Sequence, residues 1–206
     1  AISRRTLAHG YLFNNQFEKA ENIYLENLDW SDDFLNDFKR FRELGVTCPD
    51  MEKIEQLLMV KRYYNEGDNL QKARDYQGAI QAYEKSRKVA LELIGNGNNI
   101  EIQQQLVDVY SSLGKIRWMI GDLPGSLQDY ENMKDIAIEL AGKINDNEDK
   151  YYQANSYAGI GLALRDLGNM QAAREAYDQC LSIITELAAD KNNMGAQKDL
   201  AGAYMV

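Results

Sequence analysis

Residue types that build metal sites and reactive centres are scarce in this sequence. Its 206 residues include two cysteines and one histidine. Cys48 and Cys180 are far apart and form no CxxC pair, so the chain offers too few ligands for a structural zinc site. We expect no bound metal, and no motif indicates a cofactor. Two unpaired thiols are typical of a reducing compartment, which predicts a cytoplasmic protein.

Long apolar runs and basic clusters are also missing. No stretch approaches the roughly 20 apolar residues that a transmembrane helix needs, and no signal peptide is visible. The net charge is −9 with no block of lysine or arginine, whereas nucleic-acid binding requires a basic face to neutralise phosphates. We therefore expect neither a membrane nor a nucleic acid as a partner. Because there are only two prolines, long helices can run unbroken.

The strongest pattern that is present is an internal repeat with a period of 47 residues. One set of tyrosines, one set of glycines and a second set of tyrosines recur at this spacing, although the chain has only 13 tyrosines in all. The recurring positions are Tyr63, Tyr110, Tyr157 and Tyr204, then Gly67, Gly114 and Gly161, and then Tyr83, Tyr130 and Tyr177. A repeat of this length is typical of helix pairs that bury their apolar stripes against neighbouring copies.

Turn chemistry divides each repeat into two helices. Asp75, Asp122 and Asn169 occupy one repeat position, where each side chain can cap the second helix of its pair. Polar, turn-rich segments separate successive pairs. The predicted helices are 51–73, 76–94, 100–120, 123–144, 149–167 and 170–189, with a last one opening near 195.

The repeated glycines indicate close packing within each pair. A glycine costs about 1 kcal/mol against alanine inside a helix, so a close neighbour must offset that cost. We expect Gly67, Gly114 and Gly161 to face the small residues of the second helix, and the tyrosine one turn later to fill the space toward the next repeat. The small residues are Ala79, Ser126 and Ala173.

The first part of the chain departs from the regular period. Residues 1–28 resemble a less regular copy, with Ala8 in place of the glycine. An insertion follows, in which Ser31 can cap a helix, Trp30 can staple onto Leu35, and Gly45 is a typical helix stop. This extra helix has two interpretations. It either covers the gap between two repeats or forms an arm that binds a partner.

The order Tyr or Trp, Leu-Gly, Gly-Asp, Ala or Ser, and Tyr resembles the tetratricopeptide repeat (TPR) family. The resemblance implies an all-α fold, a right-handed α-solenoid of antiparallel helix pairs. The resemblance covers 1–34 weakly and 63–93, 110–140 and 157–187 well. We predict that 1–206 forms a single TPR-like solenoid, with the extra helix near 31–45. Its units lie near 1–34, 51–95, 100–145 and 149–190, with a truncated fifth at 195–206. The period exceeds the usual 34 residues of the family, and such long repeats resemble those of large bacterial multidomain proteins.

The same resemblance implies a concave groove lined by the first helix of each pair. Trp118 is the strongest candidate anchor, because tryptophans dominate interface energetics; burial of Trp118 between repeats is the competing interpretation. The expected partner-binding residues are Lys61, Tyr64, Asn65, Asp108, Lys115, Trp118, Asn155, Leu162 and Arg165. His9, Leu12 and Phe13 are the corresponding residues of the first unit.

One TPR subgroup clamps a peptide carboxylate with basic residues on successive first helices. Arg5, His9 and Asn65 match part of that pattern, but Asp108 and Ser112 stand where basic residues are required. An acidic side chain there would repel a carboxylate. We therefore do not expect this chain to bind carboxylate tails in that way.

The predicted function is a protein–protein interaction scaffold that binds a peptide or helix in its groove. The partner is another protein or another domain of the same polypeptide. The alternative is a regulatory or sensor module that controls a catalytic domain elsewhere in a larger polypeptide; a chain that begins without methionine and ends inside a predicted helix favours a longer parent protein. We expect no enzymatic activity, since His9 has no nucleophile partner in any motif.

Overall fold

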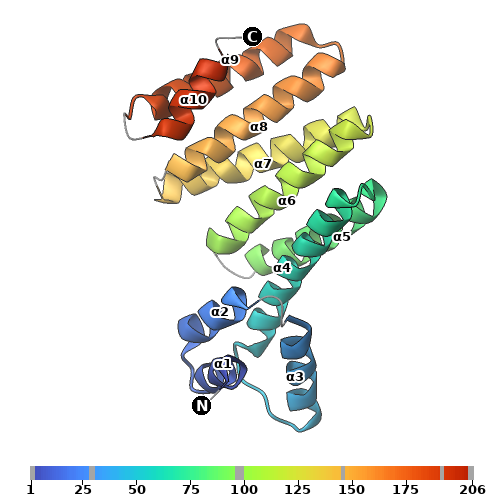
Figure 1. Cartoon of the computed structure of the whole chain (residues 1–206), viewed down its shortest axis with the longest axis vertical. Coiled ribbons are helices and arrows are strands. Elements are labelled where there is room, and N and C mark those ends of the chain that lie inside the picture. Colours follow the sequence, from blue (N-terminus) through green and yellow to red (C-terminus); the bar gives the residue numbers. More distant parts are fainter. Residues whose placement is uncertain (1–2, 28–30, 96–99, 145–146, 191–192, 204–206) are drawn as a thin grey trace. The chain divides into compact units, whose positions relative to one another are not determined.

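The computed structural model describes residues 3–27, 31–95, 100–144, 147–190 and 193–203. Within those residues the chain forms ten α-helices and no β-strand (Figure 1). The helices are α1 (Arg4–Phe13), α2 (Phe17–Glu26), α3 (Ser31–Glu43), α4 (Met51–Lys72), α5 (Tyr76–Gly95), α6 (Ile100–Met119), α7 (Leu123–Ile144), α8 (Asn147–Asp166), α9 (Met170–Ala188) and α10 (Met194–Ala203). The all-α prediction and the seven predicted helices from residue 51 onward are confirmed to within a few residues. Trp30 and Tyr204 lie outside the described residues.

The helix pairs turn in the same way at each repeat. Asp75 Oδ1 accepts a hydrogen bond from the Gly78 N–H at 2.9 Å, and Asp122 Oδ1 accepts one from the Gly125 N–H at 3.1 Å. Asn169 caps α9 in the same manner. These contacts confirm the predicted capping positions.

The residue before each cap lies in the left-handed region of backbone space. Gly121 and Gly168 both have φ +84°, and Arg74, at the equivalent position, has φ +64°. After this residue the chain hydrogen-bonds back into the first helix, as in the Asp122 N–H bond to the Arg117 carbonyl at 2.9 Å. Glycine adopts this conformation without strain, whereas arginine does not.

The chain consists of two compact units, residues 1–102 and 103–206. In unit 1, α1 packs on α2 and α4 packs on α5, while α3 and α2 both contact α4. The core of the α4–α5 pair is apolar, and the buried Ser86 hydroxyl donates a hydrogen bond to the Val60 carbonyl at 2.8 Å.

In unit 2 the helices α7, α8, α9 and α10 each pack on the next. Ser126 of α7 donates a hydrogen bond from its hydroxyl to the Gly114 carbonyl of α6 at 2.8 Å. Both residues are buried, so this hydrogen bond lies in the interface where α6 packs directly against α7.

The prediction that the repeated glycines chiefly face small residues of the second helix is wrong. A Cβ added to Gly67 would lie 2.7 Å from the Tyr83 ring, and one added to Gly161 would lie 2.6 Å from the Tyr177 ring. Gly114 faces the Tyr130 ring in the same way. The glycines therefore make room for a tyrosine ring and not chiefly for a small residue. The physical reason is size, since a ring fills the space between two helix backbones that a small side chain leaves open.

No helix in the described part of the chain is long and apolar enough to cross a membrane.

Candidate peptide-binding face

The predicted groove residues are divided between the two units. Lys61, Tyr64 and Asn65 lie on α4 in unit 1. The other six lie on α6 and α8 in unit 2, and they are Asp108, Lys115, Trp118, Asn155, Leu162 and Arg165.

In unit 1 the predicted residues are largely engaged with their neighbours. The Lys61 ammonium lies 3.6 Å from the Glu101 carboxylate, and the Tyr64 ring packs at a tilt on Tyr83 with centroids 5.5 Å apart. Asn65 is exposed. Tyr64 therefore supports the packing of α4 on α5 as well as bordering the surface.

In unit 2 the predicted residues form rows on two helices that run in the same direction (Figure 1). Lys115 and Trp118 are one turn apart on α6, and Leu162 and Arg165 are one turn apart on α8. Lys115, Asn155 and Arg165 are exposed, whereas Asp108, Trp118 and Leu162 are partly exposed. We call Lys115, Trp118, Leu162 and Arg165 the α6–α8 face.

Trp118 is held in place by a residue that the sequence did not single out. Its indole N–H donates a hydrogen bond to Asp166 Oδ2 at 2.8 Å, and Arg165 Nε donates to Asp166 Oδ1 at 2.8 Å. The Arg165 guanidinium, together with the indole N–H, holds the pKa of Asp166 below its usual value. Trp118 is therefore oriented at the surface by a fixed hydrogen bond, and it is not fully buried between repeats.

Beneath this face lies a buried ion pair. Arg117 Nη1 of α6 donates to Asp129 Oδ2 of α7 at 2.6 Å, and the Asp129 side chain is only 1% exposed. Arg117 also lies 3.7 Å from the Asp122 carboxylate in the turn. These contacts fix the last turn of α6, which carries Trp118.

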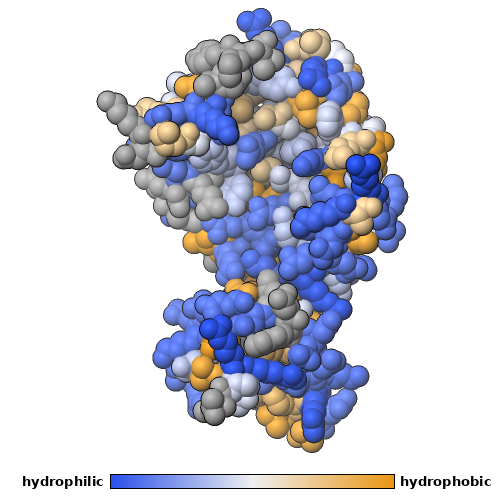
Figure 2. Space-filling view, in the orientation of Figure 1, coloured by the Kyte–Doolittle hydropathy of each residue, from blue (hydrophilic) through white to orange (hydrophobic). Residues whose placement is uncertain are grey.

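Exposed apolar side chains surround the turns next to Trp118. Met119 and Ile120 follow it at the α6–α7 turn, and Leu167 and Met170 flank the α8–α9 turn, with exposures between 40% and 65%. Figure 2 shows hydrophobic surface along the edge where these two turns lie. Because the Trp118–Asp166 bond joins the two helix ends, these apolar residues border the α6–α8 face.

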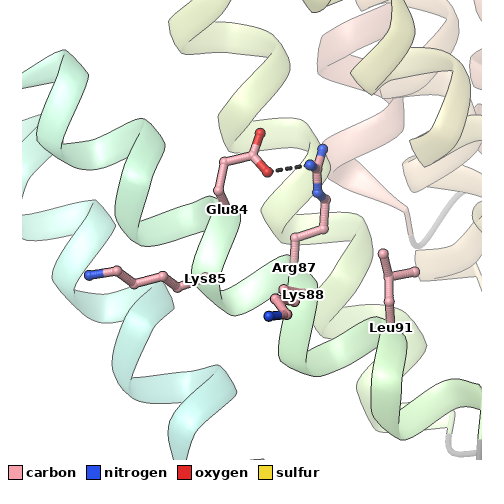
Figure 3. Close-up of a pocket in the computed structure, with 5 residues that line it drawn as sticks. All are labelled: Glu84, Lys85, Arg87, Lys88 and Leu91. Atoms are coloured by element: carbon pink, nitrogen blue, oxygen red, sulfur yellow. Dashed lines mark ion pairs between the residues drawn. The ribbon is translucent and has the colours of Figure 1, made fainter.

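A shallow hollow of about 460 Å³ lies on unit 1 (Figure 3). All of its lining residues come from α5 and are Glu84, Lys85, Arg87, Lys88 and Leu91. Glu84 and Arg87 form an ion pair with each other. The hollow is open and has polar groups on one helix only, so it lacks the converging donors of a small-molecule site.

The described residues contain no group of three or more His, Cys, Asp or Glu side chains placed to hold a metal ion. Cys48 and Cys180 are both free thiols, and burial raises the pKa of each thiol. A raised pKa disfavours the thiolate, so neither cysteine is an activated nucleophile.

Three of the described helix pairs repeat the same contact between a tyrosine ring and a glycine. This repetition places the chain in the class of α-helical repeat proteins. Residues 154–186 match the family model described as tetratricopeptide repeat, which supports the predicted TPR-type repeat. Repeats of this family generally mediate protein–protein interactions and are generally not enzymes.

Solved structures that match the chain include the crystal structure of BtubC (BKLC) from P. vanneervenii, which is 15% identical, with a TM-score of 0.56 over 90% of this chain and 80% of that one. This similarity concerns the fold alone. The crystal structure of MamA protein is 17% identical over 64% of this chain and 95% of that one, but its TM-score of 0.18 carries no structural argument. No curated protein matches the sequence significantly.

Proposed function

We propose that the chain is a non-enzymatic scaffold and that the α6–α8 face of unit 2 binds a peptide or helix of a protein partner. The observation that carries this proposal is Trp118, a partly exposed tryptophan fixed by its hydrogen bond to Asp166. A tryptophan held in one orientation loses little conformational freedom on binding, so its contact area contributes to affinity at low entropic cost.

The residues around Trp118 indicate the chemistry of the partner segment. Lys115 makes no ion pair among the described residues and is exposed, and Arg165 carries a side chain that is 45% exposed. Met119 and Leu167 add accessible apolar surface beside the indole. This combination fits a segment with an apolar side chain for the indole and a carboxylate for the cations.

The partner is another protein or another domain of a longer polypeptide. A net charge of −9 weighs against nucleic acid and against an anionic membrane surface, because both require a basic face. Two free thiols fit a cytoplasmic location.

The experiment is selection of random twelve-residue peptides on the whole chain, followed by fluorescence-polarisation titration of the selected peptides. Trp118→Ala should weaken binding about 30-fold, which corresponds to about 2 kcal/mol for a hot-spot residue. Gln128→Ala, on the exposed side of α7, is the matched control and should leave binding unchanged. Equal affinity of all selected peptides for wild type and Trp118→Ala would refute the proposed site.

A further inference from the structure

The inserted helix α3 lies on the first-helix side of unit 1. Asp37 of α3 accepts hydrogen bonds from Arg5 Nε and Nη2 of α1, both at 2.5 Å, and contacts His9 Nε2 at 2.8 Å. The His9 side chain is 12% exposed and that of Asp37 is 21% exposed, so the contact is largely sheltered from water. A two-pronged guanidinium–carboxylate contact of this kind is strong and directional.

Aromatic rings extend the same contact along α1. Phe41 of α3 packs edge-on against His9, with centroids 5.1 Å apart, and against Phe13, with centroids 5.2 Å apart. His9 and Phe13 are two of the residues that the sequence predicts for the groove face of the first unit. In unit 1, therefore, α3 occupies the α1 surface that the TPR resemblance assigns to a ligand.

Phe34 and Phe38 supply the apolar part of the contact. Both are fully buried, and both pack edge-on against Tyr24 of α2, with centroids 4.7 Å and 5.5 Å apart. The Tyr24 hydroxyl lies 2.6 Å from His9 Nδ1. A helix with phenylalanines on one face and Asp37 among them is thus recognised by an aromatic surface with a cation at its edge.

Helix α3 also forms two ion pairs with α4. Asp32 lies 3.0 Å from Arg62, and Arg42 forms an ion pair with Glu55. These pairs are partly exposed, and exposed pairs contribute little stability.

Helix α3 is not the only element that joins the α1–α2 pair to α4. Helix α2 also contacts α4 directly, although less extensively than α7 contacts α8 at the corresponding junction of unit 2. After α3 the chain is non-helical from Leu44 to Asp50, and Leu44 and Val46 are exposed. A non-helical connection does not itself hold α3 in place, so the position of α3 depends on its contacts with α1, α2 and α4.

We propose that α3 is an intramolecular ligand covering a second protein-binding surface, formed by Arg5, His9, Phe13 and Tyr24. We define this surface as the α1–α2 site. Its external partner is an amphipathic helix with a carboxylate and an aromatic residue one turn apart, which reproduces Asp37 and Phe41. This inference concerns unit 1 and does not depend on the proposed function of unit 2.

Competition follows from this arrangement. A helix tethered in the same chain acts at a high effective concentration. The apparent affinity of the partner is therefore its intrinsic affinity multiplied by the fraction of chains in which α3 is released. A change that releases α3 without altering the α1–α2 site should strengthen binding of an added helix.

The test uses a fluorescent synthetic peptide of residues 31–45 as the probe and the whole chain as the receptor. The double variant Phe34→Ala/Phe38→Ala removes the two buried rings that hold α3 and changes no residue of the α1–α2 site. It should bind the peptide at least 10-fold more tightly than wild type does. The peptide carrying Asp37→Ala should lose this binding, whereas the peptide carrying Lys39→Ala, at an exposed position of α3, should keep it.

Charge-reversal variants provide a second test in case the double alanine variant fails to fold. Chain Asp37→Arg should also release α3 and bind the wild-type peptide, and chain Arg5→Asp should prefer the Asp37→Arg peptide over the wild-type one. NMR spectra report whether α1, α2 and α4 keep their native signals in each variant.

Three results would overturn the proposal. The first is that the released variants keep their native signals and bind the peptide no more tightly than wild type. The second is that every variant that releases α3 also loses the native signals of α1 and α2, which would make α3 part of the core. The third is a dimer of the released variant that the peptide does not dissociate, which would make a second copy the occupant.

Discussion

Gly159 of α8 lies directly against the ring of Tyr130 of α7, so that a Cβ at this position would be 2.4 Å from the ring. The Cδ2–Cε2 side of the same ring meets Gly114 of α6, where an added Cβ would be 3.0 Å away. Tyr130 is thus confined between two glycines from consecutive repeats. This arrangement confirms the expectation that the tyrosine reaches toward the next repeat.

The first prediction concerns this confinement. Gly159→Ala should lower the free energy of unfolding by about 1–3 kcal/mol, because the ring has no room to move away. Urea denaturation followed by circular dichroism measures the effect. Gly142→Ala is the matched control within α7, where an added Cβ would meet nothing within 4 Å. It should stabilise the chain by roughly 0.5–1 kcal/mol, and destabilisation of equal size by both variants would contradict the packing argument.

The second prediction concerns the turn before α5. Arg74→Gly should raise the free energy of unfolding by about 1 kcal/mol, because φ +64° strains any residue that has a Cβ. The reciprocal change Gly121→Ala, at φ +84°, should lower it by a similar amount. Thermal melting of both variants decides the matter, since opposite shifts in Tm are required.

The third prediction concerns the buried ion pair under Trp118. Asp129→Ala leaves the mostly buried Arg117 guanidinium without its closest carboxylate, so the free energy of unfolding should fall by about 3 kcal/mol. Asp135→Ala removes an exposed carboxylate of the same helix and should change stability by less than about 0.5 kcal/mol. Chemical denaturation compares the two, and similar small losses would show that the Arg117–Asp129 pair contributes little.

The fourth prediction concerns pH and His9, the only histidine of the chain. Burial lowers the pKa of His9 below its usual value, although Asp37 opposes the shift by favouring the charged ring. Because the folded state prefers the neutral imidazole, the stability that His9 contributes is present above the unfolded pKa of about 6.5 and declines as the pH falls below it. The titratable and charged groups around the ring are Tyr24 from α2, Asp37 from α3 and Arg5 from α1.

NMR titration of the single imidazole measures this directly, and its midpoint should lie below about 6.5. The contribution of Asp37, whose pKa Arg5 lowers, should be lost only at more acidic pH, below about 4. His9→Gln should therefore flatten the stability of unit 1 between pH 7 and 5 while leaving the acid limb. A midpoint above 6.5 would reverse the sign and contradict the prediction.

Periodicity predicted the helix pairs because helix boundaries depend on local residues. Asp75, Asp122 and Asn169 cap their helices by contacts within four positions, and such contacts can be read from the chain itself. The Asp166 bond to Trp118 could not be predicted in this way, since it joins helices 48 positions apart in the sequence. The surface on which α3 packs could not be predicted from the sequence either. Its apolar face is evident from the phenylalanines, but the surface that receives that face depends on the path of the connecting segments.

Tyr130 couples the unfolding of neighbouring repeats in unit 2. In a stacked repeat protein, stability separates into a contribution from each repeat and a contribution from each junction between repeats. One ring seated between Gly114 and Gly159 belongs to both contributions. When the α6–α7 pair separates, the Tyr130 ring also leaves its contact with Gly159. The junction with α8 is therefore lost at the same time. Unfolding should therefore pass through the junction as a single step, with few molecules in which one pair is open and its neighbour remains closed.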